Sequence, residues 1–280
     1  MATNVTLYAW AVPAFFEDAP VDHTWVTTYD NTQKQNQYPT IQQVIDANQE
    51  YWFCWGDYHE TGGTPDNPTG ALGNQSGNLA LAQCLVAPNL DSRYNWNARG
   101  TIFYYGIDGV CHQLANQVLY ATSTSGSPLT VQEARGYYYT SFIYGTYGHN
   151  WDPNTWPNKI AQCGGPPPTV AAAVGGAAVT LPPDDFEKRA HAVLGDNPQL
   201  LGQLLALRGQ VHQFAAQKWP GPVAPSAETL NARNQHMIDQ AAALLGPEKF
   251  TQLFGFPPGR KATTVDPNIY SSQPGPKISR

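Results

Sequence analysis

Charged side chains are scarce in this sequence. Asp, Glu, Lys and Arg make up 13% of its 280 residues, which is about half of their usual share. Aromatic residues reach 12%, and Asn and Gln are frequent, so much of the polar surface must consist of amide and hydroxyl groups. A chain so rich in aromatic side chains does not belong to the disordered class.

Positive charge is scarcest in the first part of the chain. Residues 1–165 hold 5 Lys and Arg against 13 Asp and Glu, a balance of −8, whereas residues 166–280 hold 10 against 8, a balance of +2. The N-terminal part should therefore repel phosphate backbones, and no nucleic-acid partner is expected.

The common export and membrane signals are also missing. The start of the sequence carries Glu17 and Asp18 and has no basic segment before an apolar run, which is unlike a secretory signal. No apolar stretch approaches the roughly 20 residues of a membrane span. We therefore expect a soluble, cytoplasmic protein without membrane contact, although delivery by a specialised secretion system would leave the same sequence.

Cysteine motifs and metal motifs are absent as well. No CxxC spacing occurs, so neither a zinc knuckle nor a thioredoxin motif is present, and reduced thiols are expected. Asp57, His59 and Glu60, with Asp22 and His23 elsewhere, could coordinate a metal, but they follow no HExxH or EF-hand spacing, so we expect no metal and no cofactor. The four cysteines are Cys54, Cys84, Cys111 and Cys163.

Composition predicts four parts along the chain. Residues 1–163 are predicted to form an α+β domain, and residues 164–183 an uncharged Pro/Ala/Gly linker. Apolar residues at helical spacing predict a module of three to four helices over residues 184–256. Residues 257–280 lack such spacing and are predicted to be a flexible tail.

Signals at the helix ends refine the prediction for the C-terminal module. Asp184 and Asp185 are typical of a helix start, and Gly195 and Gly246 of helix ends. Pro247 is suited to open a last short helix.

The first part mixes strand, loop and helix patterns. Residues 61–78 contain Gly, Pro, Asn or Ser at nearly every position, which predicts a loop or flap beside a functional site. Apolar residues at helical spacing predict a helix over residues 110–121, capped by Asp108. A further helix is predicted at 40–48, and extended segments at 4–14, 22–30, 51–55, 101–105 and 137–147.

Cys111 is the strongest candidate for chemistry. It falls in the first turn of the predicted helix, where unpaired N–H groups favour a thiolate. His23 lies on a predicted strand and could exchange the proton, and Asp57 could orient the imidazole. These three residues would form a nucleophile, a base and an orienting acid.

The segments around these residues resemble the papain-like cysteine hydrolase superfamily, in particular its transglutaminase-like and NlpC/P60-like branches. Residues 109–119 (GVCHQLANQVL) are similar to the nucleophile helix, 23–30 (HTWVTTYD) to the His-bearing strand, and 51–57 (YWFCWGD) to the strand with the acid. Because histidine and acid precede cysteine here, the resemblance implies a circularly permuted form. It implies an antiparallel sheet packed on the nucleophile helix, with Cys111, His23 and Asp57 as the catalytic residues.

Other interpretations remain open. His149 could be the base, with Asn150 or Asp152 as its partner. Cys111 could instead be a packing residue, and His23 and Asp57 a strand and a turn residue.

The predicted function is a cysteine-dependent hydrolase or acyl transferase acting on a peptide, amide, isopeptide, thioester or other acyl substrate. The alternative is a noncatalytic aromatic-rich domain that binds a peptide or glycan. In either case the C-terminal helices could form a homo-oligomer or dock a protein partner.

Overall fold

A computed structural model of the chain describes residues 4–13, 21–28, 52–53, 71–78, 104–124, 128–149, 151, 184–216 and 225–272. The fold is α+β. Four antiparallel strands form one sheet in the order β3-β2-β1-β4. The strands are β1 (Asn4–Pro13), β2 (Asp22–Thr27), β3 (Trp52–Phe53) and β4 (Ala71–Asn78).

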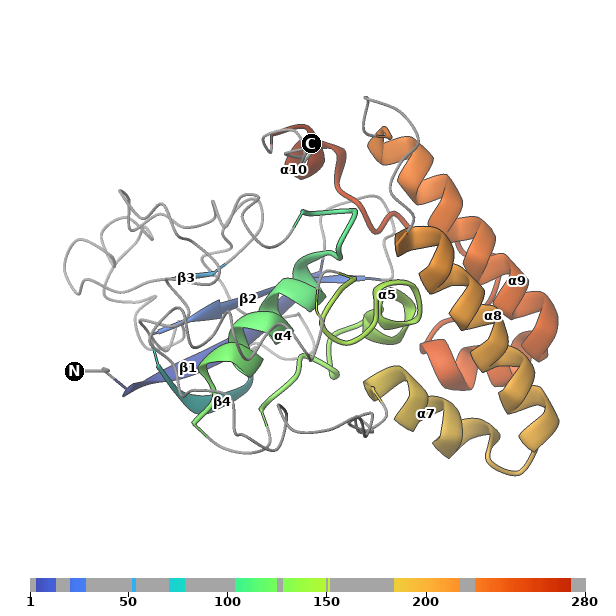
Figure 1. The fold of residues 1–280 in the computed structure, drawn as a ribbon, viewed down its shortest axis with the longest axis horizontal. Helices are drawn as coiled ribbons and strands as arrows, with labels where there is room; N and C mark the ends of the chain where they lie inside the picture. The colour runs from blue at the N-terminus through green and yellow to red at the C-terminus, as the bar shows by residue number, and fades with distance from the viewer. Residues whose placement is uncertain are drawn as a thin grey trace, which may run out of the picture.

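One helix covers the sheet, and the others extend beyond it. Figure 1 shows α4 lying along the sheet, with α5 between α4 and the helices α7 to α9. Among the described residues, no helix is both long and apolar enough to cross a lipid bilayer. The helices are α4 (Cys111–Thr122), α5 (Tyr137–Tyr144), α7 (Asp185–Leu194), α8 (Pro198–Ala216), α9 (Ala227–Phe254) and α10 (Pro267–Ser272).

The two faces of the sheet are different. Because side chains alternate along a strand, Ala9 and Val26, which pair between β1 and β2, lie on one face and join the core under α4. Trp10 and Trp25 pair on the other face and are fully buried, and the Trp10 indole donates to Thr27 Oγ1 at 2.8 Å. Both faces of the sheet are therefore buried where these two pairs join β1 to β2.

One hydrophobic core runs from the sheet into the C-terminal helices. Val118 of α4, Phe142 of α5, Phe186 of α7 and Phe254 of α9 all belong to it. The ring of Phe142 lies 5.1 Å from that of Phe186 and 5.7 Å from that of Phe254. Helices α7 to α9 thus pack on α5 and do not have a core of their own, whereas the predicted linker 164–183 lies outside the described residues.

Arg208 joins these helices by polar contacts. Its side chain is only 4% exposed and donates to the carbonyls of Phe142 and Ser141 at the C-terminal end of α5. It also pairs with Asp184, the N-cap of α7, and with Glu187 at 3.3 Å. The guanidinium therefore donates hydrogen bonds to carbonyl groups at the end of α5, and it also pairs with two acids at the start of α7.

Several predictions of local structure are confirmed. β1 and β2 lie within the predicted segments 4–14 and 22–30, and α4 fills the predicted helix 110–121 almost residue for residue. Asp184 caps α7 by accepting from Glu187 N, and Gly195 ends that helix. Gly246, with φ of 71°, interrupts α9 directly before Pro247.

Two predictions for the N-terminal part are wrong. Residues 71–78 of the predicted flap form β4, because Gly77 and its neighbours pair with β1 through backbone groups and Leu7 occupies the space that a Cβ would fill. Residues 137–144 form a helix and not an extended segment. Glycines at positions 136 and 145 bound this helix with positive φ, and packing in the core overrides the strand preference of tyrosine.

The predicted flexible tail is also corrected. Ala262, Thr264 and Val265 are at most 4% exposed, and α10 follows them. Asn231 of α9 accepts from the amides of Thr264 and Val265 and donates to the carbonyl of Val265 at 2.8 Å. Residues 262–265 thus pack on the core although they lack a periodic pattern, whereas residues 273–280 of the predicted tail lie outside the described residues.

Candidate functional site at the start of helix α4

Cys111 is the first residue of α4, as predicted. Val110 is the extended N-cap residue, and its amide is held by the side chain of Gln113 at 3.1 Å. Asp108, the predicted cap, instead accepts from the amide of Tyr104 at 2.6 Å. The cysteine therefore has the predicted place in the helix, with a different cap.

The environment of the sulfur differs from the expectation. Cys111 is 6% exposed, and its Sγ lies 3.7 Å from the carbonyl oxygen of Asp22 on β2. Burial raises the pKa of the thiol to about 11, although hydrogen bonds from Thr24 and the backbone of His112 act in the opposite direction. In the resting protein the sulfur is thus a thiol that donates a hydrogen bond, and not a thiolate.

His23 lies on the other face of the sheet. It pairs with Val12 of β1, two positions away from the Trp10–Trp25 pair along each strand, whereas Cys111 contacts β2 beside Asp22 and Thr24. Alternation therefore places the imidazole on the face of Trp25, and the two rings stack at 5.7 Å with an interplanar angle of 26°. The structure does not bring His23 and Cys111 together.

The alternative base His149 also lies elsewhere. Its ring packs 5.4 Å from Tyr144 and 5.3 Å from His212 of α8. Burial, the neighbouring His212 and two arginines lower the pKa of His149 to about 3. This imidazole is therefore neutral and faces the C-terminal helices.

The remaining predicted partners lie outside the described residues. They are Asp57, the two alternative partners of His149, the three cysteines other than Cys111, and two further side chains that were considered above as metal ligands. Among the residues that the structure describes, no three His, Cys, Asp or Glu side chains converge as metal ligands would. The undescribed residues of these groups are Asp57, Asn150, Asp152, Cys54, Cys84, Cys163, His59 and Glu60.

His112 is more prominent in the structure than in the sequence. It is fully buried, its Nδ1 lies 2.8 Å from Thr140 Oγ1, and its Nε2 has no hydrogen-bond partner among the described residues. Burial lowers the pKa of His112 to about 4, although a contact with the backbone of Asp22 acts in the opposite direction. A neutral, buried imidazole thus follows the cysteine directly, which the sequence shows only as adjacency.

The polar side of α4 is also buried, where it binds the segment that contains α5. Asn116 donates to the Thr146 carbonyl at 2.8 Å and accepts from Val131 N at 2.9 Å. Gln113 donates to the Gly145 carbonyl at 3.1 Å, and Gln117 to the Tyr147 carbonyl. These amides position residues 131–147 around the start of α4.

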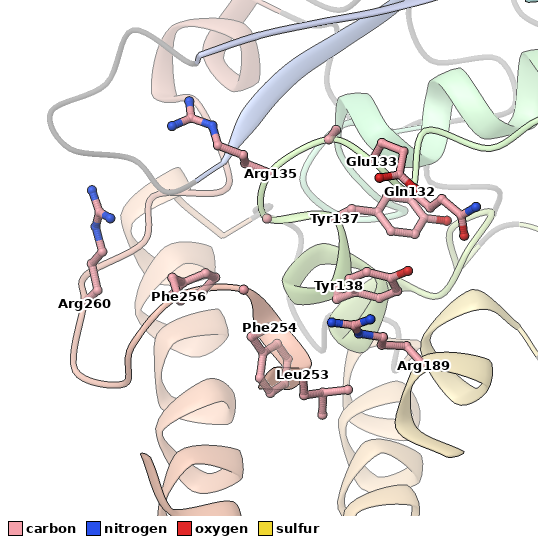
Figure 2. Close-up of a pocket in the computed structure, with 13 residues that line it drawn as sticks. Gln132, Glu133, Arg135, Tyr137, Tyr138, Arg189, Leu253, Phe254, Phe256 and Arg260 are labelled. Atoms are coloured by element: carbon pink, nitrogen blue, oxygen red, sulfur yellow. The ribbon is translucent and has the colours of Figure 1, made fainter. Parts of the chain in front are cut away.

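A second feature is a cavity that no sequence motif marks. It measures about 250 Å³ and lies where the loop before α5, helix α7 and the end of α9 meet (Figure 2). Its lining contains three arginines from distant parts of the chain, Arg135, Arg189 and Arg260, together with Tyr138 and Glu133, among others. Only tertiary structure collects these arginines, so sequence reasoning had no signal with which to find them.

Comparison of the chain with family models, with curated proteins and with solved structures finds no match. The family therefore stays a prediction from the resemblance.

Proposed function

We propose that the protein is a cysteine-dependent hydrolase or acyl transferase with a papain-like layout, in which Cys111 is the nucleophile. The observation that carries this proposal is the position of its sulfur, at the first residue of a helix that packs on an antiparallel sheet, 3.7 Å from the backbone of β2. The strand touched is the one that bears His23, as the resemblance to papain-like enzymes implies.

The chemistry would begin from a thiol. Because burial raises the pKa of Cys111 to about 11, a base must remove the proton as the sulfur attacks the carbonyl carbon. The backbone N–H of Cys111, at the helix start, is suited to hold the resulting oxyanion. The proton then passes to the leaving amine or thiol, and water or an amine releases the acyl group from sulfur.

Two histidines, His23 and His112, are candidates for the base. For His23 to serve, β2 would have to present its other face to α4, since the sheet now lies between the ring and the sulfur. His112 lies on the same side of the sheet as Cys111, is neutral at pH 7 and, like Cys111, contacts the backbone of Asp22. The variants His23→Ala and His112→Asn therefore distinguish the two assignments.

The nucleophile is tested by trapping the acyl-enzyme. The folded protein is incubated with a p-nitrophenyl acyl ester and, separately, with iodoacetamide, and the modified peptide is located by mass spectrometry. The proposal expects both labels on Cys111 ahead of the other thiols, and their loss in Cys111→Ala. Cys54→Ala, Cys84→Ala and Cys163→Ala are the matched controls. Labelling of Cys111 only after unfolding would refute the proposal.

The second candidate is a noncatalytic recognition domain. It is favoured by the raised pKa of Cys111 and by the separation of Cys111 from His23. Under this function Cys111→Ala would leave ligand binding unchanged, and no acyl-enzyme would form with any ester.

A further inference from the structure

We propose that the cavity between α5, α7 and the end of α9 binds a short acidic peptide segment through Arg135, Arg189 and Arg260. This binding site goes beyond the proposed chemistry and does not depend on Cys111. The three arginines lie in a protein whose net charge is −6, so a positive cavity is a local departure from the whole molecule.

The charge balance of the cavity stays positive after its acids are counted. Glu133 is the carboxylate in the lining, and Asp22 pairs with Arg135 from outside it at 2.7 Å. The described part of the lining thus contains three guanidinium groups and one carboxylate. A carboxylate on a ligand is the group that guanidinium groups bind best.

Arg135 and Arg189 keep donors at the surface. Arg135 is 54% exposed although Asp22 binds its Nε and Nη2, and Arg189 uses Nη2 to reach the carbonyl of Gln252 at 2.7 Å. A guanidinium has five N–H donors in a planar fork, so these contacts leave others for a ligand. They also hold the side chains in place before the ligand arrives, which reduces the entropy cost of binding.

The arrangement of the lining favours a ligand with charge beside an apolar group. Figure 2 shows Arg135 and Arg260 on one side and Arg189 on the other, with Phe254 and Phe256 between them. The Arg189 guanidinium lies 5.3 Å from the centre of the Tyr138 ring. A carboxylate can thus reach a guanidinium fork while a neighbouring apolar side chain covers the aromatic floor.

The rim favours a peptide over a compact polyanion. Glu133 would repel phosphate, but its carboxylate can accept from a peptide N–H, and Gln132 beside it can both donate and accept. A volume of about 250 Å³ is at the lower end for ligand pockets. It suits a few residues of an extended chain.

The test uses the full chain and two blocked peptides, acetyl-Glu-Phe-Glu-amide and acetyl-Gln-Phe-Gln-amide. Calorimetric titration should give an affinity at least about 10-fold higher for the acidic peptide. Arg260→Gln should weaken that binding about 10-fold, whereas Lys261→Gln, the same charge change at the adjacent exposed residue outside the lining, should change it less than about twofold.

Arg260→Gln is the decisive variant, because Arg260 is exposed. Arg189→Gln is a second variant, checked for folding by circular dichroism since Arg189 also binds α9. Equal affinity for the two peptides, equal weakening by Lys261→Gln, or displacement of the acidic peptide by millimolar inorganic phosphate would each overturn the assignment. None of these outcomes depends on Cys111 labelling.

Discussion

Asp22 and Arg135 are separated by 113 residues in sequence and are joined through both backbone and side chain. Asp22 N donates to the Arg135 carbonyl, Arg135 N donates to Asp22 Oδ2, and the guanidinium binds Asp22 Oδ1 at 2.7 Å. The Asp22 carbonyl also accepts a hydrogen bond from the Cys111 thiol. One residue of β2 thus contacts both the candidate nucleophile and the arginine-lined cavity.

Asp22→Asn should destabilise the fold. Asp22 is 3% exposed, and a buried hydrogen bond to a charged partner contributes about 1–3 kcal/mol. We expect urea unfolding at pH 7 to show a loss of that order. Asp196→Asn is the control, because that side chain is 74% exposed and lies 3.8 Å from Lys249; equal losses would contradict a special role of Asp22.

Arg208→Met should be more severe. The substitution leaves Asp184 without its buried cation and leaves two α5 carbonyls without a donor. Removing one partner of a buried pair costs about 3–5 kcal/mol. Thermal unfolding of Arg208→Met against Lys261→Met, an exposed position, measures the difference. A melting temperature within a degree of the control would show that the network is unimportant.

Acid should weaken the fold through its buried histidines. Burial lowers the pKa values of His112 and His212 to about 4 and that of His149 to about 3, against about 6.5 in an unfolded chain. The unfolded state therefore binds more protons, and stability falls as pH drops from about 6.5 toward 4. For His112 alone the loss is roughly 3 kcal/mol.

His112→Asn tests this dependence, because an amide can keep the bond to Thr140. Its stability should decline less than that of the parent protein between pH 7 and pH 4.5 in urea titrations. His191→Asn, at an exposed position of α7, should follow the parent curve. Parallel curves for His112→Asn and the parent would show that His112 does not carry the effect.

Val265→Ala tests the packed position of residues 262–265. Val265 is fully buried in the core, and deleting two of its methyl groups should cost about 2 kcal/mol. Lys261→Ala, nearby and exposed, should cost almost nothing. Equal stability of the two variants in urea would restore the expectation of a flexible tail.

Gly77→Ala tests the pairing of β4. A Cβ at this position would overlap Leu7 Cδ1, and Leu7 is fully buried, so overpacking should cost about 1–3 kcal/mol. Gly202→Ala in α8 has nothing within 4 Å of the added Cβ and should stabilise the helix by about 0.5–1 kcal/mol. The same sign of change in both variants would contradict this pairing.

The sequence by itself determined the elements whose signals are local. Helix α4, the capping of α7 by Asp184 and the break at Gly246 follow from apolar spacing and from end residues that act within a few positions. The same reasoning placed Cys111 at a helix start, because that position depends only on its neighbours in the chain.

Only the tertiary structure decided which groups meet and which are buried. The thiol pKa of Cys111 depends on what covers the sulfur, and His23 faces away because of how β2 lies against α4. The helix at 137–144 and the meeting of Arg135, Arg189 and Arg260 likewise come from packing. Whether a side chain is buried, and which side chains it contacts, depends on residues far apart in the sequence. A local sequence pattern therefore cannot predict either property.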